Sequence, residues 1–251
     1  IPLTILSPRH ADEAMSSAPP AAPVAPPVEP AEDFLSAADL LRHARPEELS
    51  LRSSVALVLD ERENIILYER NADEQRPIAS LTKLMTAMVC LDAKLPLDEK
   101  IVISRADRDR LRGSKSRLSY GTKLTRRDTL QIALAASENR AAHALARTYP
   151  GGKEAFIKAM NDKADRLGLK DTHFRDPTGL HSGNVSTAAD LARLVAAAGE
   201  YKLIRRMTTT SKGSVTDLRK GWKVEFLNTN RLVRKKEWSI GLSKTGYIAD
   251  A

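Results

Sequence analysis

Residues 77–88, which read PIASLTKLMTAM, decide the fold. Pro77 stands where helices often begin, and the apolar run after it continues to residue 93. A second proline, Pro96, lies just beyond that run. The stretch therefore predicts a helix over residues 81–93, with Ser80 at its start. Side chains three positions apart lie on one helix face, so Ser80 and Lys83 are expected to meet.

Ser80 and Lys83 form a Ser-x-x-Lys motif, which predicts a nucleophile and its base. A serine hydroxyl is a poor nucleophile until a base removes its proton. A lysine can be that base only if its pKa is lowered, and both burial and a nearby cation lower it. The motif is also common by chance. Taken alone, it is explained better by an N-cap serine followed by a surface lysine.

A second motif, Ser137-Glu138-Asn139, lies between two segments with helical patterns. Such a turn can aim a hydroxyl and an amide in one direction, so Ser137 could relay a proton to a leaving amine. Asn139 could hold a substrate carbonyl or orient the lysine. The alternative is a serine that ends one helix and an asparagine that caps the next.

A third motif, Lys244-Thr245-Gly246, lies on the last predicted strand. Lys244 and Thr245 suit the binding of a carboxylate. Gly246 has no Cβ, so a peptide could approach the backbone and add to the strand edge. The alternative is an ordinary strand that ends in a turn. Each motif is a weak signal alone, whereas the three in this order favour one common site.

Strands are expected near both ends of the chain and helices in the middle. Aliphatic runs at residues 54–59 and 65–68 flank a polar turn and predict a β-hairpin. Helices are predicted over residues 34–43, 81–93, 125–137, 139–149, 153–167 and 186–198, and strands over residues 222–226 and 239–247. This segregation predicts an α+β fold, with an antiparallel sheet built from the chain ends and an inserted helical region.

Residues 1–33 are predicted to be an N-terminal tail, and residues 34–251 a single domain. Residues 16–32 are rich in Ala and Pro, a composition typical of an extended tether. The apolar start, residues 1–6, is interpreted as the remnant of a signal peptide. No apolar run in the sequence approaches the length of a membrane span.

The chain has 251 residues and a net charge of +8, which favours anionic partners such as nucleic acid, lipid or cell-wall polymer. It carries no helix-turn-helix or zinc-finger signature, so we expect no nucleic-acid partner. The single cysteine, Cys90, lies in an apolar run and is expected to be a buried, inert thiol. His143, His173 and His181 lack the spacing of a zinc site and are interpreted as bystanders.

The three motifs in this order are the signature of penicillin-binding proteins and class A β-lactamases. From residue 51 to residue 251 the chain resembles low-molecular-mass penicillin-binding proteins, the D-alanyl-D-alanine carboxypeptidases and endopeptidases. Residues 77–88 look like the nucleophile segment of that family. Five segments resemble the endopeptidase branch of the family, which is typified by penicillin-binding protein seven. They are residues 91–99, 137–142, 149–152, 176–180 and 184–187. The resemblance implies a β-lactamase/transpeptidase-like fold.

The resemblance also implies a serine-type peptidase that hydrolyses D-alanyl bonds of peptidoglycan. Ser80 would form the acyl-enzyme, Lys83 would be the general base, and Ser137 would return a proton to the leaving amine. Substrate would be bound by Asn139, Lys244, Thr245, Gly246 and Tyr247, with the backbone N–H groups of Ser80 and Tyr247 as the oxyanion hole. The implied ligands are peptidoglycan stem peptides and β-lactam antibiotics, and no metal or cofactor is needed.

Peptidoglycan lies outside the cytoplasmic membrane, so the resemblance implies a periplasmic location. In the family, two further strands and a C-terminal helix follow the Lys-Thr-Gly strand, whereas this chain stops at Ala251. We therefore expect the last strand to lack its sheet neighbour. The helical region that carries Ser80 and Ser137 is expected to be less affected.

Two other functions are compatible with the same motifs. A β-lactamase needs a fast deacylation device, in class A a glutamate acting through water, and residues 175–179 (RDPTG) offer no such glutamate. A wall-binding module would bind penicillin without useful catalysis, and missing C-terminal strands would favour it. Slow release of bound penicillin would favour a peptidase over a β-lactamase. A Ser80→Ala protein that kept full wall-remodelling function would support the wall-binding module.

Overall fold

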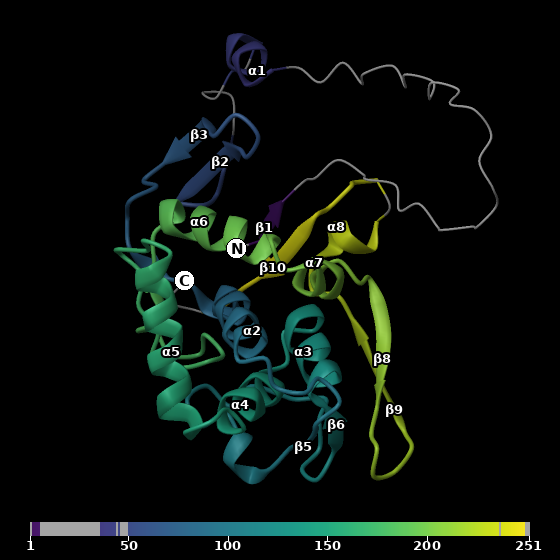
Figure 1. Ribbon diagram of the computed structural model, residues 1–251. Helices are drawn as coiled ribbons and strands as arrows, with labels where there is room; N and C mark the ends of the chain where they lie inside the picture. The colour runs from purple at the N-terminus through teal and green to yellow at the C-terminus, as the bar shows by residue number, and fades with distance from the viewer. Residues whose placement is uncertain (1, 6–35, 44, 46–49, 236, 249–251) are drawn as a thin grey trace, which may run out of the picture.

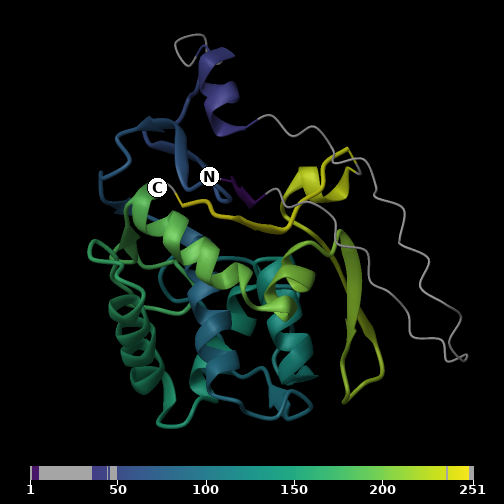
Figure 2. The ribbon, with the colours of Figure 1, turned by 45° about the horizontal axis from the view of Figure 1, so that its top comes forward.

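The computed structural model describes residues 2–5, 36–43, 45, 50–235 and 237–248. One helix, α2 (Thr82–Asp92), runs through the middle of a group of helices, and the hairpins lie on the outside (Figures 1 and 2). A single turn of 3-10 helix, η2 (Ala79–Leu81), leads into α2. The motif around Ser80 therefore begins the central helix of the fold.

Helix α2 is mostly apolar, and residues 82–90 are buried on all sides. Leu84, Met85 and Met88 are each 0% exposed. Burial of a side chain of this size stabilises a fold by about 1.5–3 kcal/mol. The helices that contact α2 are α3 (Arg126–Ala135), α4 (Asn139–Arg147), α5 (Gly152–Arg166), α6 (Ala188–Gly199) and α7 (Lys202–Thr208).

The strands form antiparallel pairs around this helical region. β2 (Ala56–Asp60) pairs with β3 (Ile65–Arg70) and packs beside α6, while β8 (Lys212–Thr216) and β9 (Lys223–Leu227) form a second hairpin. The shorter pairs are β4 (Arg76–Pro77) with β7 (Val185–Ser186) and β5 (Lys100–Val102) with β6 (Lys123–Thr125). The remaining helices are short: α1 (Ala37–His43), η3 (Arg105–Asp107) and α8 (Arg231–Arg234).

The two ends of the chain meet in one antiparallel pair. β10 (Leu242–Thr245) carries the Lys-Thr-Gly motif and pairs with β1 (Pro2–Ile5), with Lys244 opposite Leu3. The expectation that the last strand lacks a neighbour is therefore wrong for this structure. An open strand edge leaves backbone N–H and C=O groups unpaired, and residues 2–5 satisfy them here.

The predicted α+β class is confirmed, and so are the first hairpin and the helical positions in the middle of the chain. The helix predicted over residues 34–43 is found as Ala37–His43, and residues 34 and 35 lie outside the described residues. Pro77 was expected at a helix start but ends β4. β5, β6, β8 and α7 are not predicted by the residue pattern, because they are short or rich in polar residues.

Cys90 is buried, as predicted, and burial raises the pKa of its thiol to about 12, with the Arg126 charge acting against that shift. A thiol that stays protonated is a poor nucleophile. Within the described residues, no helix combines the length and the hydropathy needed to cross a membrane. The predicted tail, residues 1–33, lies mostly outside the described residues.

Candidate active site

Ser80 and Lys83 meet at the start of the central helix. Ser80 lies in η2 and is partly exposed, whereas Lys83, one turn later, is 0% exposed. The Lys83 Nζ atom lies 2.8 Å from the Ser80 Oγ atom. A solvent-facing hydroxyl thus lies directly above a buried amine.

Two further acceptors hold the Lys83 amine in place. Its Nζ donates to the Asn139 side-chain carbonyl at 2.8 Å and to the Thr178 backbone carbonyl at 2.7 Å. Burial lowers the pKa of Lys83 to about 8, although the Asp176 and Glu138 carboxylates oppose the shift. A substantial fraction of this lysine is therefore neutral in mildly alkaline solution.

The three contacts of the Lys83 Nζ atom suit a neutral amine that acts as a base. A neutral amine has two hydrogens and one lone pair, and the carbonyls of Asn139 and Thr178 accept hydrogen bonds but cannot donate them. If the two hydrogens point to these carbonyls, the lone pair is left facing the Ser80 hydroxyl. The arrangement can therefore remove the Ser80 proton.

Ser137 lies in the turn between α3 and α4, in a left-handed conformation with φ of 57°. Such a conformation costs a non-glycine residue about 1–3 kcal/mol and is concentrated at functional sites. The Lys244 Nζ atom donates to the Ser137 Oγ atom at 3.0 Å and to the Thr245 carbonyl at 2.7 Å. Ser137 thus joins the helical region to β10.

Lys244 is the second buried lysine of the site and is 1% exposed. Burial lowers its pKa well below the usual value, and the neighbouring Lys83 charge adds to the shift. An anionic group beside Lys244 would stabilise its protonated form. The position therefore suits a ligand carboxylate.

The backbone around Ser80 is closely packed on two sides by glycines. A Cβ atom on Gly179 (φ of 84°) would lie 1.7 Å from the Ala79 carbonyl oxygen. A Cβ atom on Gly246 would lie 3.1 Å from the Ser80 nitrogen. Ala79 itself has a φ of 48°. The N–H of Ser80 therefore lies beside the end of β10, as an oxyanion hole shared with that strand requires.

The other predicted site residues lie at the same end of β10. Asn139 is partly exposed, and its amide nitrogen donates to the Ser114 hydroxyl at 2.9 Å. Thr245 is partly exposed and donates a hydrogen bond to the Thr229 hydroxyl. The Tyr247 side chain is 87% exposed and projects into solvent. Hydrogen bonds thus join Ser80, Lys83 and Asn139 into one group and Ser137 and Lys244 into another, and Gly246 lies against Ser80. Thr245 and Tyr247 are the chain neighbours of Gly246.

The sequence analysis missed the loop that supplies the Thr178 carbonyl. The Asp176 carboxylate accepts hydrogen bonds from the Gly179 N–H, at 2.9 Å, and from the Thr178 hydroxyl. The Asn184 amide donates to the Asp176 carbonyl at 2.8 Å and to the Thr82 hydroxyl at 3.0 Å. The Asp-Pro-Thr-Gly sequence signals a turn, but a backbone acceptor leaves no mark in the sequence.

The three histidines interpreted as bystanders take no part in the hydrogen bonds described above, although the charges of Asp176 and Lys83 act on His143. The His181 Nδ1 atom accepts the Gly183 N–H at 2.9 Å, and His173 forms a backbone bridge with Val185. Burial lowers the pKa of His143. Over the described ranges, no three His, Cys, Asp or Glu side chains gather as metal ligands do.

Comparison with known proteins places this site in a family. Residues 42–251 match the family described as D-alanyl-D-alanine carboxypeptidase. The D-alanyl-D-alanine endopeptidase of Pseudomonas aeruginosa is 49% identical over 206 residues, which are 82% of this chain and 66% of that protein. The D-alanyl-D-alanine endopeptidase of Escherichia coli K12 is 46% identical over 197 residues, 78% of this chain and 64% of that protein. The chain thus spans just under two thirds of the length of these relatives.

A solved structure supports the same assignment. A mutant of the DD-transpeptidase from Streptomyces strain K15 superposes with a TM-score of 0.73 at 30% identity, over 81% of this chain and 84% of that one. The predicted β-lactamase/transpeptidase-like fold and the resemblance to the endopeptidase branch are both confirmed. On its sequence, its fold and the arrangement of its three motifs, the chain belongs to the D-alanyl-D-alanine carboxypeptidase family.

Proposed function

We propose that this chain is a serine-type peptidase that hydrolyses D-alanyl peptide bonds of peptidoglycan through an acyl-enzyme on Ser80. One observation carries the proposal: the Lys83 Nζ atom lies 2.8 Å from the Ser80 Oγ atom, and two carbonyl oxygens engage its remaining positions. Burial lowers the pKa of Lys83 to about 8, as a general base requires.

The proposed acylation step begins with Lys83 and Ser80 and ends with Ser137. Lys83 takes the proton of Ser80 as the hydroxyl attacks the carbonyl carbon of the penultimate D-Ala. The N–H groups of Ser80 and Tyr247 bind the oxygen that becomes negative. The C–N bond then breaks as Ser137 gives its hydroxyl proton to the leaving amine, and the proton that Lys83 took replaces it, so that Lys83 is neutral again. In the second step water gives a proton to Lys83 as it attacks the ester carbon. The C–O bond to Ser80 breaks, and the same proton restores the Ser80 hydroxyl.

Substrate binding falls to the residues around β10. Lys244 and Thr245 bind a carboxylate of the peptide, and Asn139 contacts the substrate amide while it orients Lys83. Gly246 lets the end of β10 lie against the Ser80 backbone, and the peptide would lie along the edge of β10 that is not paired with β1. The same groups accept penicillin, because its lactam mimics the D-Ala-D-Ala amide and carries a carboxylate.

Identities of 49% and 46% to two endopeptidases favour cleavage of cross-links over removal of a terminal D-Ala. Because its substrate is cell-wall peptide, we propose a periplasmic location. We also propose that residues 34–251 form the peptidase domain, to which β1 (Pro2–Ile5) adds a strand, and that residues 1–33 otherwise form a tail.

A β-lactamase is the main alternative, and the carboxylates nearest Lys83 argue against it. Asp176 accepts the Gly179 N–H, and Glu138 accepts the N–H groups of Arg117 and Arg140. Both are buried and engaged by the backbone, whereas a deacylating glutamate must hold a water beside the ester. We therefore expect slow release of bound penicillin.

The test is mass spectrometry of the chain after exposure to benzylpenicillin, followed by digestion of cross-linked muropeptides. We expect one covalent adduct, located on Ser80, and release of monomers from the cross-linked substrate. A Ser80→Ala variant should show neither result. An adduct without peptide hydrolysis would favour a penicillin-binding module, and fast turnover of penicillin would favour a β-lactamase. Failure of the folded chain to form an adduct would overturn the proposal.

A further inference from the structure

A basic segment borders the site and has no part in the chemistry described above. We call residues 105–117 the basic loop, and they include six Lys or Arg residues and two Asp residues. All six cationic residues are exposed: Arg105, Arg108, Arg110, Arg112, Lys115 and Arg117. The segment therefore presents a concentrated positive charge to solvent.

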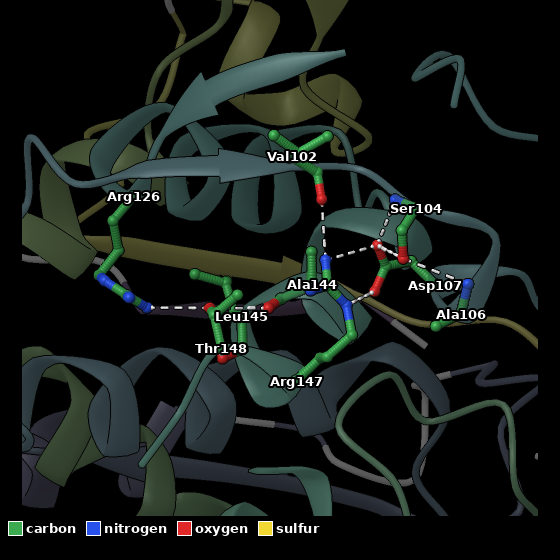
Figure 3. Close-up of polar contacts among 9 residues, drawn as sticks. All are labelled: Val102, Ser104, Ala106, Asp107, Arg126, Ala144, Leu145, Arg147 and Thr148. Atoms are coloured by element: carbon green, nitrogen blue, oxygen red, sulfur yellow. Dashed lines mark hydrogen bonds and ion pairs between the residues drawn. The ribbon is translucent and has the colours of Figure 1, made fainter. Parts of the chain in front are cut away.

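The two carboxylates of the basic loop are turned inward. Asp107 is 0% exposed and pairs with Arg147 of α4 at 2.8 Å, as Figure 3 shows. Asp109 is 6% exposed, and its carboxylate accepts the N–H groups of Leu111, Arg112 and Ser114. The anionic charges are thus occupied within the protein, while the cationic charges remain at the surface.

Hydrogen bonds fasten the basic loop to both sides of the active site. The Ser114 hydroxyl accepts from the Asn139 amide at 2.9 Å, and the Arg117 N–H donates to the Glu138 carboxylate at 3.0 Å. On the other side, the Arg112 side chain donates to the Leu180 carbonyl at 2.8 Å. Asn139 contacts Lys83 directly. The loop is therefore fixed beside the groups that would bind a substrate.

We infer that the basic loop is a subsite for carboxylates of the wall peptide other than the one that Lys244 binds. This inference rests on the proposed function. Cross-linked stem peptides are polyanions. The diaminopimelate that supplies the leaving amine carries the carboxylate that Lys244 would bind, and a second diaminopimelate, in the stem that acylates Ser80, carries another free carboxylate. Arg110 and Lys115 are suited to bind it, since neither forms an ion pair with a carboxylate anywhere in the described ranges.

A peptide is favoured over a nucleic acid because the basic loop is short and is hydrogen-bonded to Asn139 of the site. Recognition of a nucleic-acid backbone uses a basic surface that extends along many phosphates. Here the cations lie on one loop of 13 residues whose Ser114 is joined to Asn139. A ligand that reaches Ser80 would therefore meet these cations at the same time.

The test measures binding without catalysis. In a Ser80→Ala background, the Kd of a cross-linked muropeptide dimer is determined by isothermal titration calorimetry at low salt. One sample carries Arg110→Gln and Lys115→Gln, and a control carries Lys212→Gln and Lys223→Gln, which remove equal charge from the exposed β8–β9 hairpin. We expect the loop variant to bind about three- to tenfold more weakly, as two exposed charge contacts imply. The control should match the parent.

A second substrate identifies the ligand group. With a dimer amidated only on the diaminopimelate carboxylate of the stem that acylates Ser80, the parent should bind as weakly as the loop variant, and the loop variant should lose nothing more. The inference would be overturned if parent and loop variant bound the dimer with equal affinity, or if the control lost as much affinity as the loop variant. It would also be overturned if the loop variant still bound the amidated dimer more weakly than the parent. The inference would also be overturned if the loop variant bound short duplex DNA more weakly than the parent but bound the muropeptide dimer equally well. Failure of the proposed function would be seen separately, as a lack of penicillin adduct on the chain with Ser80 intact.

Discussion

The two buried lysines of the site lie in regions that are held in different ways. On the helix side, Lys83 is built into the first turn of α2 and is anchored by Asn139 and by the Thr178 carbonyl. On the strand side, Lys244 lies on β10, and its Nζ contacts Ser137 and the Thr245 carbonyl. Lys83 is held by acceptors from two other parts of the chain, whereas Lys244 lies on a strand and its Nζ contacts one side chain outside that strand.

The two lysines are held differently because one is proposed to act as a base and the other to bind a ligand. A base must be held at a fixed distance from the hydroxyl it deprotonates, and the packed core around α2 provides that rigidity. A group that binds a carboxylate needs access to the ligand, and the partly exposed end of β10 provides it. Burial lowers the pKa of both lysines, but Lys83 contacts the Ser80 hydroxyl, whereas Lys244 contacts the Ser137 hydroxyl.

The largest expected effect follows from removing the base. Lys83→Met keeps the buried volume but deletes the amine, and we expect the acylation rate by benzylpenicillin to fall about a thousandfold, within the range for general-base catalysis. Lys163→Met is the control, because Lys163 pairs with Asp92 on the far side of the helices. Stopped-flow or mass-spectrometric acylation kinetics measures both. A fall of less than tenfold would contradict the assignment of Lys83 as the base.

Gly179→Ala tests how closely the helix side is packed. Its Cβ would lie 1.7 Å from the Ala79 carbonyl, so the backbone before Ser80 must shift. A misplacement of about 1 Å can cost about a hundredfold in rate. Gly168→Ala is a matched control, since Gly168 has a φ of 68° and open space around it. In both variants an alanine must adopt a left-handed backbone conformation, which costs about 1–2 kcal/mol. Only Gly179→Ala should also lose acylation activity.

Lys244→Met should affect the strand side and leave the base intact. Contacts to a charged partner are worth about 1.5–3 kcal/mol, so we expect acylation by benzylpenicillin to slow about 10- to 100-fold. The loss should be small with a penicillin ester, whose carboxylate charge is masked. Equal losses with the acid and the ester would show that Lys244 does not read the carboxylate.

The smallest effect concerns the support behind the base. The Thr86 hydroxyl donates to the Pro177 carbonyl at 2.7 Å, next to Thr178. Thr86→Val should lower the free energy of unfolding by about 1–3 kcal/mol, because it leaves a buried acceptor unpaired. We expect acylation to slow only a few-fold. Thr129→Val, which removes a hydrogen bond to Thr125 within α3, should lower stability and leave acylation unchanged. Chemical denaturation and acylation kinetics provide the two readouts.

The sequence predicted the helix side better than the strand side. Ser80 and Lys83 are three positions apart, so helix geometry alone brings them together. The Thr178 carbonyl is a backbone atom 95 positions from Lys83, and no residue pattern encodes such a contact. Asp176, Glu138 and Ser114 support the site from nearby, and their roles depend on how separate loops meet.

The missed elements have physical reasons as well. β5 and β6 are three residues long, and each begins with an exposed or half-exposed lysine, so period-2 alternation cannot be recognised in them. Pro77 favours a helix start but equally suits the end of a short strand, because it has no N–H to leave unpaired. The pairing of β10 with β1 joins residues more than 230 positions apart, a distance at which local pattern carries no information.

The central claim is that neutral Lys83 removes the proton of Ser80, and the pH dependence of acylation tests it most directly. Because burial lowers the pKa of Lys83 to about 8 in the folded protein, the reactive form increases as pH rises through that value. The acylation rate by benzylpenicillin should rise about tenfold per pH unit below this pKa and level off above it. Lys83→Met should lose the rising limb. A rate that is flat between about pH 6 and pH 9, or the same limb in Lys83→Met, would contradict the claim.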